Sequence, residues 1–264
     1  MTSSAVSSLV KALDTQALYG PMTPLPLRPD SRVLVLTGAG ISAESGVPTF
    51  RGAGGLWEGH PVTDVASPEG FDADPALVWR FYGERRQARK TVVPNPGHHA
   101  LVTLERALGD RFLLATQNVD GLHREAGSQR VLAIHGELFE SKCEQCRAPF
   151  PDERTYLGEP VPRCQTCGQR IRVNVVWFGE MLDPKHLRRI DRFIAEAGNR
   201  LVFLAVGTSG LVYPAAGLVD SAKQVGGVTV LVDLAPNREH ARRFDRVEVG
   251  KSGEILPRLL AAAQ

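Results

Sequence analysis

Four cysteines carry the clearest chemical signal in this chain of 264 residues. Cys143 and Cys146 form one C-x-x-C pair, Cys164 and Cys167 form another, and seventeen residues separate the pairs. Each pair can place two thiolates about 2.3 Å from one Zn²⁺, and the spacing is typical of zinc ribbons. A redox-active pair would instead begin a helix beside a strand, whereas these pairs lie among prolines, glycines and basic residues. We therefore predict one structural zinc, closed to water and substrate by four sulfur ligands.

A glycine-rich segment, GAGISA at positions 38–43, forms a second candidate site. It follows the apolar run RVLVLT and matches G-x-G-x-x-G/A, in which small residues let backbone N–H groups approach a pyrophosphate at the start of a helix. An ordinary dinucleotide-binding fold then ends a second strand with an acidic residue about twenty positions later. Here that region is RGAGGLWEGH, with no strand expected. We predict a dinucleotide site whose next segment is a loop carrying Phe50, Arg51 and Trp57 toward the cofactor, which argues against a standard dehydrogenase.

These two sites must be positioned by a regular framework, which five apolar runs supply. The runs are apolar on consecutive residues, as expected of strands covered on both faces of a parallel sheet. Helical stretches alternate with them, including 184–197 with Pro184 near its start and Gly198 just past its end. The alternation predicts an α/β, doubly wound, Rossmann-like parallel sheet. The runs lie at 32–37, 111–116, 131–136, 200–207 and 228–234.

Two stretches interrupt this alternation, and we predict that both are modules inserted at strand ends. The first is punctuated by glycine and proline and contains one aromatic helix, and the second holds all four cysteines. The expected organisation is an N-terminal arm or helix at 1–30, a Rossmann-like domain at 31–52, 101–136 and 172–264, a cofactor loop with a small helical module at 53–100, and a zinc-ribbon module at 137–171.

The overall charge is nearly balanced, with 31 Lys and Arg against 29 Asp and Glu. Such a chain lacks the field of a dedicated nucleic-acid or membrane-surface binder, and we expect neither partner. The N-terminal segment has no basic start, and Lys11 and Asp14 interrupt its apolar stretch, so it resembles neither a signal peptide nor a spanning helix. We therefore expect a cytoplasmic protein.

Further motifs occur in a fixed order: GAGISAESGVPTFRG from Gly38, TQNVDGLH from Thr116, IHGELF from Ile134, VVWFGE from Val175 and GTSGLVYPAA from Gly207. With the cysteine quartet, this order resembles the sirtuins, which are NAD-dependent protein-lysine deacylases. The resemblance covers about 33–260, nearly the whole chain. It implies that NAD is a consumed cosubstrate and that acylated-lysine proteins or peptides are the partners.

The resemblance also implies roles for individual residues. His135 would be the general base, which suits an imidazole that is largely neutral near physiological pH. The segment VVWFGE would present a strand edge to the substrate peptide, with contacts from Val176, Phe178, Gly179 and Glu180. The residues implied to contact NAD are Gly38, Ala39, Gly40, Ile41, Ser42, Ala43, Thr49, Phe50, Arg51, Trp57, Gln117, Asn118, Val119, Asp120, Gly207, Thr208, Ser209, Asp233 and Ser252.

In the implied reaction, the acyl oxygen of the modified lysine attacks the anomeric carbon of NAD and expels nicotinamide, forming an alkylimidate. His135 then helps a ribose hydroxyl attack that imidate, and water releases free lysine and O-acyl-ADP-ribose. Two alternatives remain open at this point. One is a protein mono-ADP-ribosyltransferase, and the other is a zinc-ribbon module that binds a nucleotide without turnover.

Tyr82 and Arg85 lie three residues apart, on one face of the expected helix VWRFYGERRQARK, and the resemblance implies that they contact the acyl group. The sirtuin branch that removes succinyl and malonyl groups has Tyr-x-x-Arg at the matching place. A guanidinium binds a carboxylate through two parallel hydrogen bonds, and a phenol can add a third. The competing interpretation is a helix whose tyrosine packs inward and whose arginine is solvated.

Two departures from the family pattern affect the expected contacts. Val173 follows Arg172 where relatives usually have proline, and Asp233-Leu234-Ala235 replaces the common Asn-x-Glu, so Ala235 cannot bind a ribose hydroxyl. No catalytic role is expected for the remaining histidines singled out here, which are His98, His99, His123, His186 and His240.

Overall fold

A six-stranded sheet with the order β11-β10-β9-β1-β4-β5 forms the centre of the protein, described here by a computed structural model. The structure describes residues 22–48, 56–57 and 59–261, with the backbone alone at 56 and 57. Every neighbouring pair in the sheet is parallel, so the predicted doubly wound α/β fold is confirmed. The strands are β1 (Arg32–Thr37), β4 (Phe112–Thr116), β5 (Val131–Ala133), β9 (Leu201–Val206), β10 (Val228–Asp233) and β11 (Arg246–Val249).

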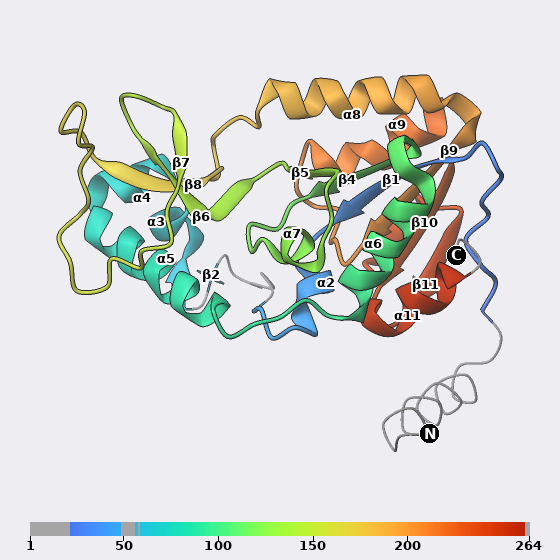
Figure 1. Cartoon of the computed structure of the whole chain (residues 1–264), viewed down its shortest axis with the longest axis horizontal. Coiled ribbons are helices and arrows are strands. Elements are labelled where there is room, and N and C mark those ends of the chain that lie inside the picture. Colours follow the sequence, from blue (N-terminus) through green and yellow to red (C-terminus); the bar gives the residue numbers. More distant parts are fainter. Residues whose placement is uncertain (1–21, 49–55, 58, 262–264) are drawn as a thin grey trace, which may run out of the picture.

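Helices cover both faces of this sheet, which explains why its strands are apolar on consecutive residues. Leu34 and Leu36 pack into one core with α8 (Pro184–Ala197) and α9 (Leu218–Gln224). The alternate residues Val33 and Val35 pack into a second core with α6 (Pro96–Leu108) and α11 (Ser252–Leu259). Figure 1 shows these two helical layers on opposite sides of the strands.

The strand order reverses between β1 and β9. From β1 the chain adds β4 and β5 on one side of the sheet, and it then adds β9, β10 and β11 on the other side. Ligands of open α/β sheets bind at such a switch point, beyond the carboxyl ends of the strands. The glycine-rich segment lies there, because Gly38 N donates to the Val206 carbonyl at 2.9 Å. A Cβ on Gly38 would lie 2.7 Å from the Gly207 carbonyl oxygen, so a larger residue cannot fit.

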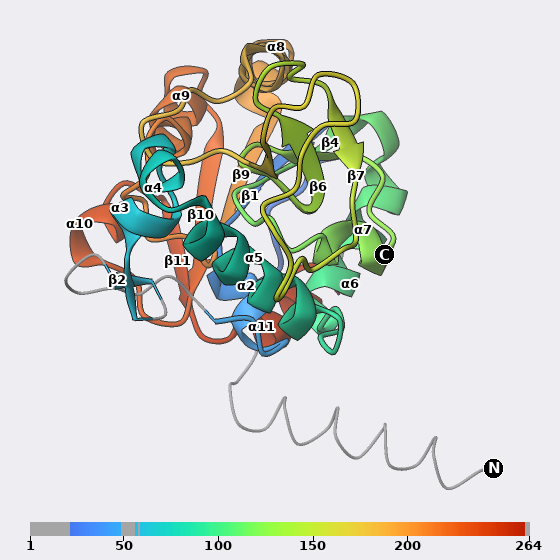
Figure 2. The same ribbon diagram turned by 90° about the vertical axis from the view of Figure 1, so that its left-hand side faces the viewer.

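A smaller second lobe lies at one end of the sheet (Figure 1). It holds an antiparallel sheet of order β7-β6-β8 together with three helices. The helices, β6 and β8 share a core that includes Trp79, Tyr82 and Trp177. In Figure 2 this end faces the viewer, with the helices on one side and β6 and β7 on the other. The elements are α3 (Val62–Val65), α4 (Pro68–Ala73), α5 (Pro75–Arg89), β6 (Gly136–Cys143), β7 (Pro149–Pro151) and β8 (Ile171–Val175).

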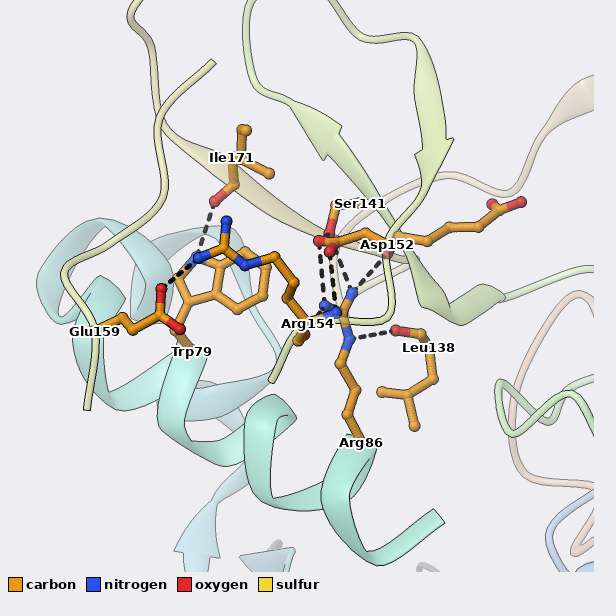
Figure 3. A network of polar contacts seen from close by, with 9 residues as sticks. Trp79, Arg86, Leu138, Ser141, Asp152, Arg154, Glu159 and Ile171 are labelled. Carbon is orange, nitrogen blue, oxygen red and sulfur yellow. Dashed lines mark hydrogen bonds and ion pairs between the residues drawn. The ribbon is translucent and has the colours of Figure 1, made fainter. Parts of the chain in front are cut away.

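The buried guanidinium of Arg86 joins α5 to the β6–β7 hairpin (Figure 3). Its Nε donates to the Leu138 carbonyl at 2.8 Å, Nη2 donates to Ser141 Oγ at 3.1 Å, and Nη1 lies 3.2 Å from Asp152 Oδ2. A buried charge is tolerated only when it is paired and hydrogen-bonded. The helix that carries Tyr82 and Arg85 is therefore held on the small sheet through Arg86.

Several local expectations need correction. The run predicted at 131–136 is split, because β5 ends at Ala133 and β6 begins at Gly136. No strand was expected around Trp57, but Leu56 and Trp57 form a two-residue strand, which pairs only with His60 and Pro61 in a small antiparallel ribbon. The expected N-terminal helix lies outside the described residues. The short elements are α2 (Gly40–Ala43), β2 (Leu56–Trp57), β3 (His60–Pro61), α7 (Leu122–Ala126), α10 (Arg238–Ala241) and the 3-10 turns Gly109–Arg111, Gly198–Arg200 and Ala215–Gly217.

Residues 22–30 of the N-terminal lead pack along the sheet edge. Leu25 is buried in the core beside α11, and its N–H donates to the Leu259 carbonyl at 2.8 Å. Arg246 donates to the carbonyl of Pro24 at 3.0 Å. Among the described residues, no helix combines the length and the apolar character needed to cross a bilayer.

Candidate functional site

The segment that follows β4 is bonded directly to the glycine-rich turn. Asn118 Nδ2 donates to the Gly38 carbonyl and to Ser42 Oγ, both at 3.1 Å. Ser42 Oγ in turn donates to Asp120 Oδ2 at 2.7 Å, and Leu122 N donates to the other carboxylate oxygen at 2.9 Å. Burial raises the pKa of Asp120, and the bonds from Leu122 and Ser42 oppose that shift. Two motifs 80 residues apart thus form one polar cluster at the switch point.

Gln117 connects this cluster to the loop after β9. Its backbone N–H donates to the Thr37 carbonyl at 2.9 Å, and its side-chain Nε2 donates to Thr208 Oγ1 at 2.9 Å. Thr208 is buried, Ser209 is exposed, and Gly207 has a φ of 58° that favours glycine. The structure therefore brings the predicted residues of three separate motifs to one end of the sheet.

His135 lies in the two-residue turn between β5 and β6, not at the end of a strand as predicted. Its Nδ1 is 3.1 Å from the carbonyl oxygen of Gln117. A carbonyl can only accept, so Nδ1 carries the proton of the neutral ring and Nε2 is left with a lone pair. Burial lowers the pKa of His135, with the Gln117 carbonyl acting in the opposite direction. The ring is thus kept neutral and can take a proton at Nε2.

The stretch after β8 is a turn, so the prediction of a strand edge over Val175 to Glu180 is wrong for the residues beyond Val175. Its N–H groups are already bonded: Val176 N donates to the His135 carbonyl at 2.8 Å, and Phe178 N donates to the Ala66 carbonyl at 2.9 Å. Phe178 and Gly179 are exposed. A peptide that pairs here must therefore use the remaining backbone groups.

Glu180 is bonded inside the protein. Its carboxylate accepts two hydrogen bonds from Arg172, at 2.8 and 2.9 Å, and a third from Trp177 N at 2.9 Å. Burial is the largest single influence on Glu180 and would raise its pKa. The hydrogen bonds from Arg172 and Trp177 together outweigh burial, so the pKa of Glu180 is lowered. Glu180 thus shapes the turn, and its contact with the substrate stays a prediction.

Tyr82 and Arg85 lie on one face of α5, and Tyr82 contacts Trp177 of the same turn. Tyr82 is fully buried, and its hydroxyl oxygen accepts from Trp177 Nε1 at 3.0 Å. Arg85 is half-buried, its guanidinium lies over the Phe81 ring, and its Nη1 donates to the Phe81 carbonyl at 2.9 Å. The competing interpretation of a helix with an inward-packed tyrosine and a solvated arginine is thus confirmed for Tyr82.

The residues expected at the adenosine end lie at the carboxyl edge of β10 and at the start of α11. Asp233 Oδ1 accepts from Ala235 N at 2.8 Å. Ser252 Oγ donates to Glu44 Oε1 at 3.0 Å, and Gly253 N donates to the same oxygen at 2.8 Å. Glu44 was missed by sequence reasoning, because its partners follow it by more than 200 residues.

Other predicted contacts differ in their setting. The Ile41 side chain is buried in the core, so only its backbone can face a ligand. Ala43 is exposed, Ala39 is half-buried, and Val119 packs against the small-lobe core. Thr49, Phe50 and Arg51, and the Trp57 side chain, lie outside the described residues.

Two of the histidines to which no catalytic role was given are buried directly behind the site. His123 Nε2 lies 2.9 Å from Thr37 Oγ1, and the centroids of the His98 and His123 rings are 4.8 Å apart, with the ring planes tilted by 57°. His98 Nδ1 also accepts from Asn95 N at 3.3 Å, which closes a capping box at the start of α6. The pair therefore supports the β1 end of the site structurally.

This burial predicts a pH-dependent stability. Burial above all, aided by His99 and Arg89, lowers the pKa of His98 to about 4. In the unfolded chain His98 has an ordinary pKa near 6.5, so it binds a proton at a pH where the folded protein keeps it neutral. Stability therefore falls as the pH falls from about 6.5 toward 4. Between pH 7.5 and 5.0, we expect the unfolding free energy of the wild type to fall by about 2 kcal/mol more than that of His98→Gln, a variant that keeps a capping acceptor. Urea unfolding at both pH values measures this loss. The exposed neighbour variant His99→Gln is the control, since it leaves His98 and its burial, the main cause of the shift, in place. Equal losses in all three proteins contradict the prediction.

The four cysteines meet in one cluster at the end of the small sheet, with all four sulfurs within 4.8 Å of one another. Cys143 and Cys167 Sγ are 3.4 Å apart, and Cys146 and Cys164 Sγ are 3.9 Å apart. Sulfurs bound tetrahedrally at about 2.3 Å from Zn²⁺ lie about 3.8 Å apart. The N–H groups of Gln145 and Cys146 also point to Cys143 Sγ, both at 3.4 Å, as suits a thiolate. The quartet is thus placed to bind a structural zinc.

Comparison with known proteins agrees with this geometry. The model of the Sir2 family matches residues 38–214. An NAD-dependent protein deacylase of Pasteurella multocida is 45% identical over 234 residues, which cover 87% of this chain and 97% of that protein. A solved complex of a Sir2 homologue with NAD superposes with a TM-score of 0.80 at 40% identity, covering 88% of this chain and 90% of the other. A Sir2 protein bound to an acetylated peptide superposes with a TM-score of 0.75 at 29% identity, covering 88% and 92%.

Proposed function

The chain belongs to the Sir2 family and is an NAD-dependent protein deacylase, and we propose that it acts preferentially on lysines whose acyl group ends in a carboxylate. The observation that carries this preference is the pairing of Tyr82 with the half-buried Arg85 on one face of α5, next to the turn at Trp177. We further propose that His135 is the general base and that the cluster around Asp120 holds the nicotinamide end of NAD.

The polar cluster supports these roles by its rigidity. NAD supplies the electrophilic anomeric carbon, and the acyl oxygen of the modified lysine is the nucleophile. Gly38 and Gly40 leave the backbone bare at the switch point, where a Cβ on Gly40 would lie 2.5 Å from Gly207 Cα. Asn118 and Asp120 are fixed by Ser42, so their side chains need no reorganisation when the cosubstrate binds. Preorganised polar groups of this kind can favour the strained, reactive pose of a bound substrate.

His135 suits the second half of the reaction. Its Nδ1–H is held by the Gln117 carbonyl, so Nε2 can accept the proton of a ribose hydroxyl as that oxygen attacks the acyl carbon. The backbone carbonyl of the same residue accepts a hydrogen bond from Val176 N, which links the base to the turn after β8. The base and the substrate segment are therefore positioned by one structural unit.

The acidic-acyl preference follows from charge. A guanidinium can form two charge-assisted bonds with a carboxylate, and an acetyl group offers no such partner. In the structure Arg85 is folded onto the Phe81 carbonyl, so the acyl carboxylate would exchange a neutral acceptor for a charged one. Because Arg85 is half-buried and Tyr82 is fully buried, an arriving carboxylate meets Arg85 before Tyr82.

We expect Arg85→Met to lower kcat/KM for a succinyl-lysine peptide by about 100-fold, while the acetyl-lysine value changes by less than about three-fold, because only succinyl presents a carboxylate. Release of free nicotinamide from both peptides with NAD measures the two values. Arg80→Met, at an exposed arginine of the same helix, is the matched control and is expected to leave both unchanged. Equal losses on the two peptides would contradict the proposed preference.

A further inference from the structure

The hydrogen bond between Trp177 and Tyr82 has a fixed direction. An indole N–H can only donate, so the Tyr82 oxygen accepts at 3.0 Å and the phenolic proton must point elsewhere. Both side chains are buried, with Tyr82 0% and Trp177 2% exposed. Within the described part of the chain, the Tyr82 hydroxyl donates to no acceptor. This proton is thus buried and has no acceptor among the described residues.

Trp177 is itself held from three sides. The Arg172 guanidinium lies over the indole, 3.2 Å from the ring centroid, and Arg172 is paired with Glu180. The Glu180 carboxylate also accepts from the backbone N–H of Trp177 at 2.9 Å. The Phe71 ring packs at 5.3 Å between centroids. With ring and backbone both fixed, the indole N–H cannot turn away from Tyr82.

We propose that Trp177 is a positioning residue for acyl selectivity, whose indole N–H occupies the acceptor side of the Tyr82 hydroxyl and reserves the phenolic proton for a carboxylate on the acyl chain. This inference rests on the proposed preference for acidic acyl groups. An acetyl group carries no such acceptor, so the indole N–H matters only for the acidic substrates. Burial, the largest cause, raises the pKa of Tyr82 to about 12, so the phenol keeps its proton and acts as a donor at physiological pH.

The test compares Trp177→Phe with the wild-type enzyme on succinyl-lysine and acetyl-lysine forms of one peptide. Phenylalanine keeps an aromatic ring in the small-lobe core and removes the N–H. We expect kcat/KM for desuccinylation to fall by about ten-fold, while the value for deacetylation stays within about two-fold. General loosening of the turn would lower both values together, so a fall common to both substrates overturns the inference. If Trp177→Phe fails to fold, β-(3-benzothienyl)alanine at position 177, which has sulfur in place of the N–H, is measured instead.

A double-mutant cycle with Tyr82→Phe tests whether Trp177 changes acyl selectivity through Tyr82. We expect Tyr82→Phe to reduce the succinyl-to-acetyl ratio, and we expect Trp177→Phe to cause no further reduction in that background. An equal further reduction would show that Trp177 acts independently of Tyr82 and would overturn the inference. If Arg85→Met already lowers both activities equally, the proposed preference fails and this inference falls with it. If Arg85→Met is selective but Trp177→Phe leaves the ratio unchanged, the role of Trp177 alone is refuted.

Discussion

Replacing His135 by alanine is expected to lower kcat/KM for deacylation by about 10²–10⁴-fold, the usual contribution of a positioned general base. The physical reason is specific, because the bond from Nδ1 to the Gln117 carbonyl fixes the tautomer that leaves Nε2 able to accept a proton. Formation of O-acyl-ADP-ribose from an acyl-lysine peptide and NAD gives the rate. Thermal unfolding of the variant, compared with the wild type, confirms that the fold is retained.

The same variant separates the two halves of the reaction. Expulsion of nicotinamide precedes the step assigned to His135, so exchange of labelled nicotinamide into NAD should persist in His135→Ala. Since burial lowers the pKa of His135, the neutral base persists below pH 6.5, and the wild-type rate should fall only as the pH drops through that lowered pKa. Loss of exchange in parallel with deacylation would argue that His135 supports the fold or the binding of NAD instead.

The sequence was sufficient where short-range patterns determine the structure. Consecutive apolar residues marked β1, β4, β9 and β10, because a strand buried on both faces leaves no polar alternation. Pro184 and Gly198 marked the ends of α8, where a proline lacks an N–H and a glycine with φ of 54° ends the helix. The two C-x-x-C pairs were equally local, so the cysteine cluster could be anticipated without knowing the fold.

Features that depend on pairing across the chain could not be anticipated. Ile134 continues the apolar run of β5, yet the chain turns at Ile134 and His135 because Gly136 pairs with Val175 and starts the small sheet. The turn after Val175 likewise depends on Arg172 and Glu180, and no local signal distinguishes it from a strand. The partners of Arg86 lie 52 to 68 residues away, so a basic residue in a helix of several arginines gives no sign that it is buried.

Loss of zinc is expected to have the largest effect on stability, since structural zinc sites contribute about 10–16 kcal/mol of apparent binding free energy in small peptides. Cys143 ends β6, the strand that pairs with both β7 and β8, and the same hairpin holds the carbonyl and hydroxyl partners of Arg86. We expect Cys143→Ser to bind less than one zinc per chain and to exchange amide hydrogens faster in β6, β8 and α5. Metal analysis and hydrogen exchange measure these effects, with Thr166→Ser as the control inside the second C-x-x-C pair.

The pattern of exchange matters as much as its size. Zinc holds only the small lobe, whereas β1 and β9 are covered by their own helices and share no cysteine ligand, so their amides should stay protected in Cys143→Ser. Because Arg86 holds α5 on the β6–β7 hairpin, a loosened hairpin would also loosen α5 and the position of Tyr82. Acyl selectivity would then fall with zinc content, while NAD would still bind at the large sheet. Uniform loss of protection over both lobes would contradict this separation, because it would mean that the cysteine cluster stabilises the chain as one cooperative unit.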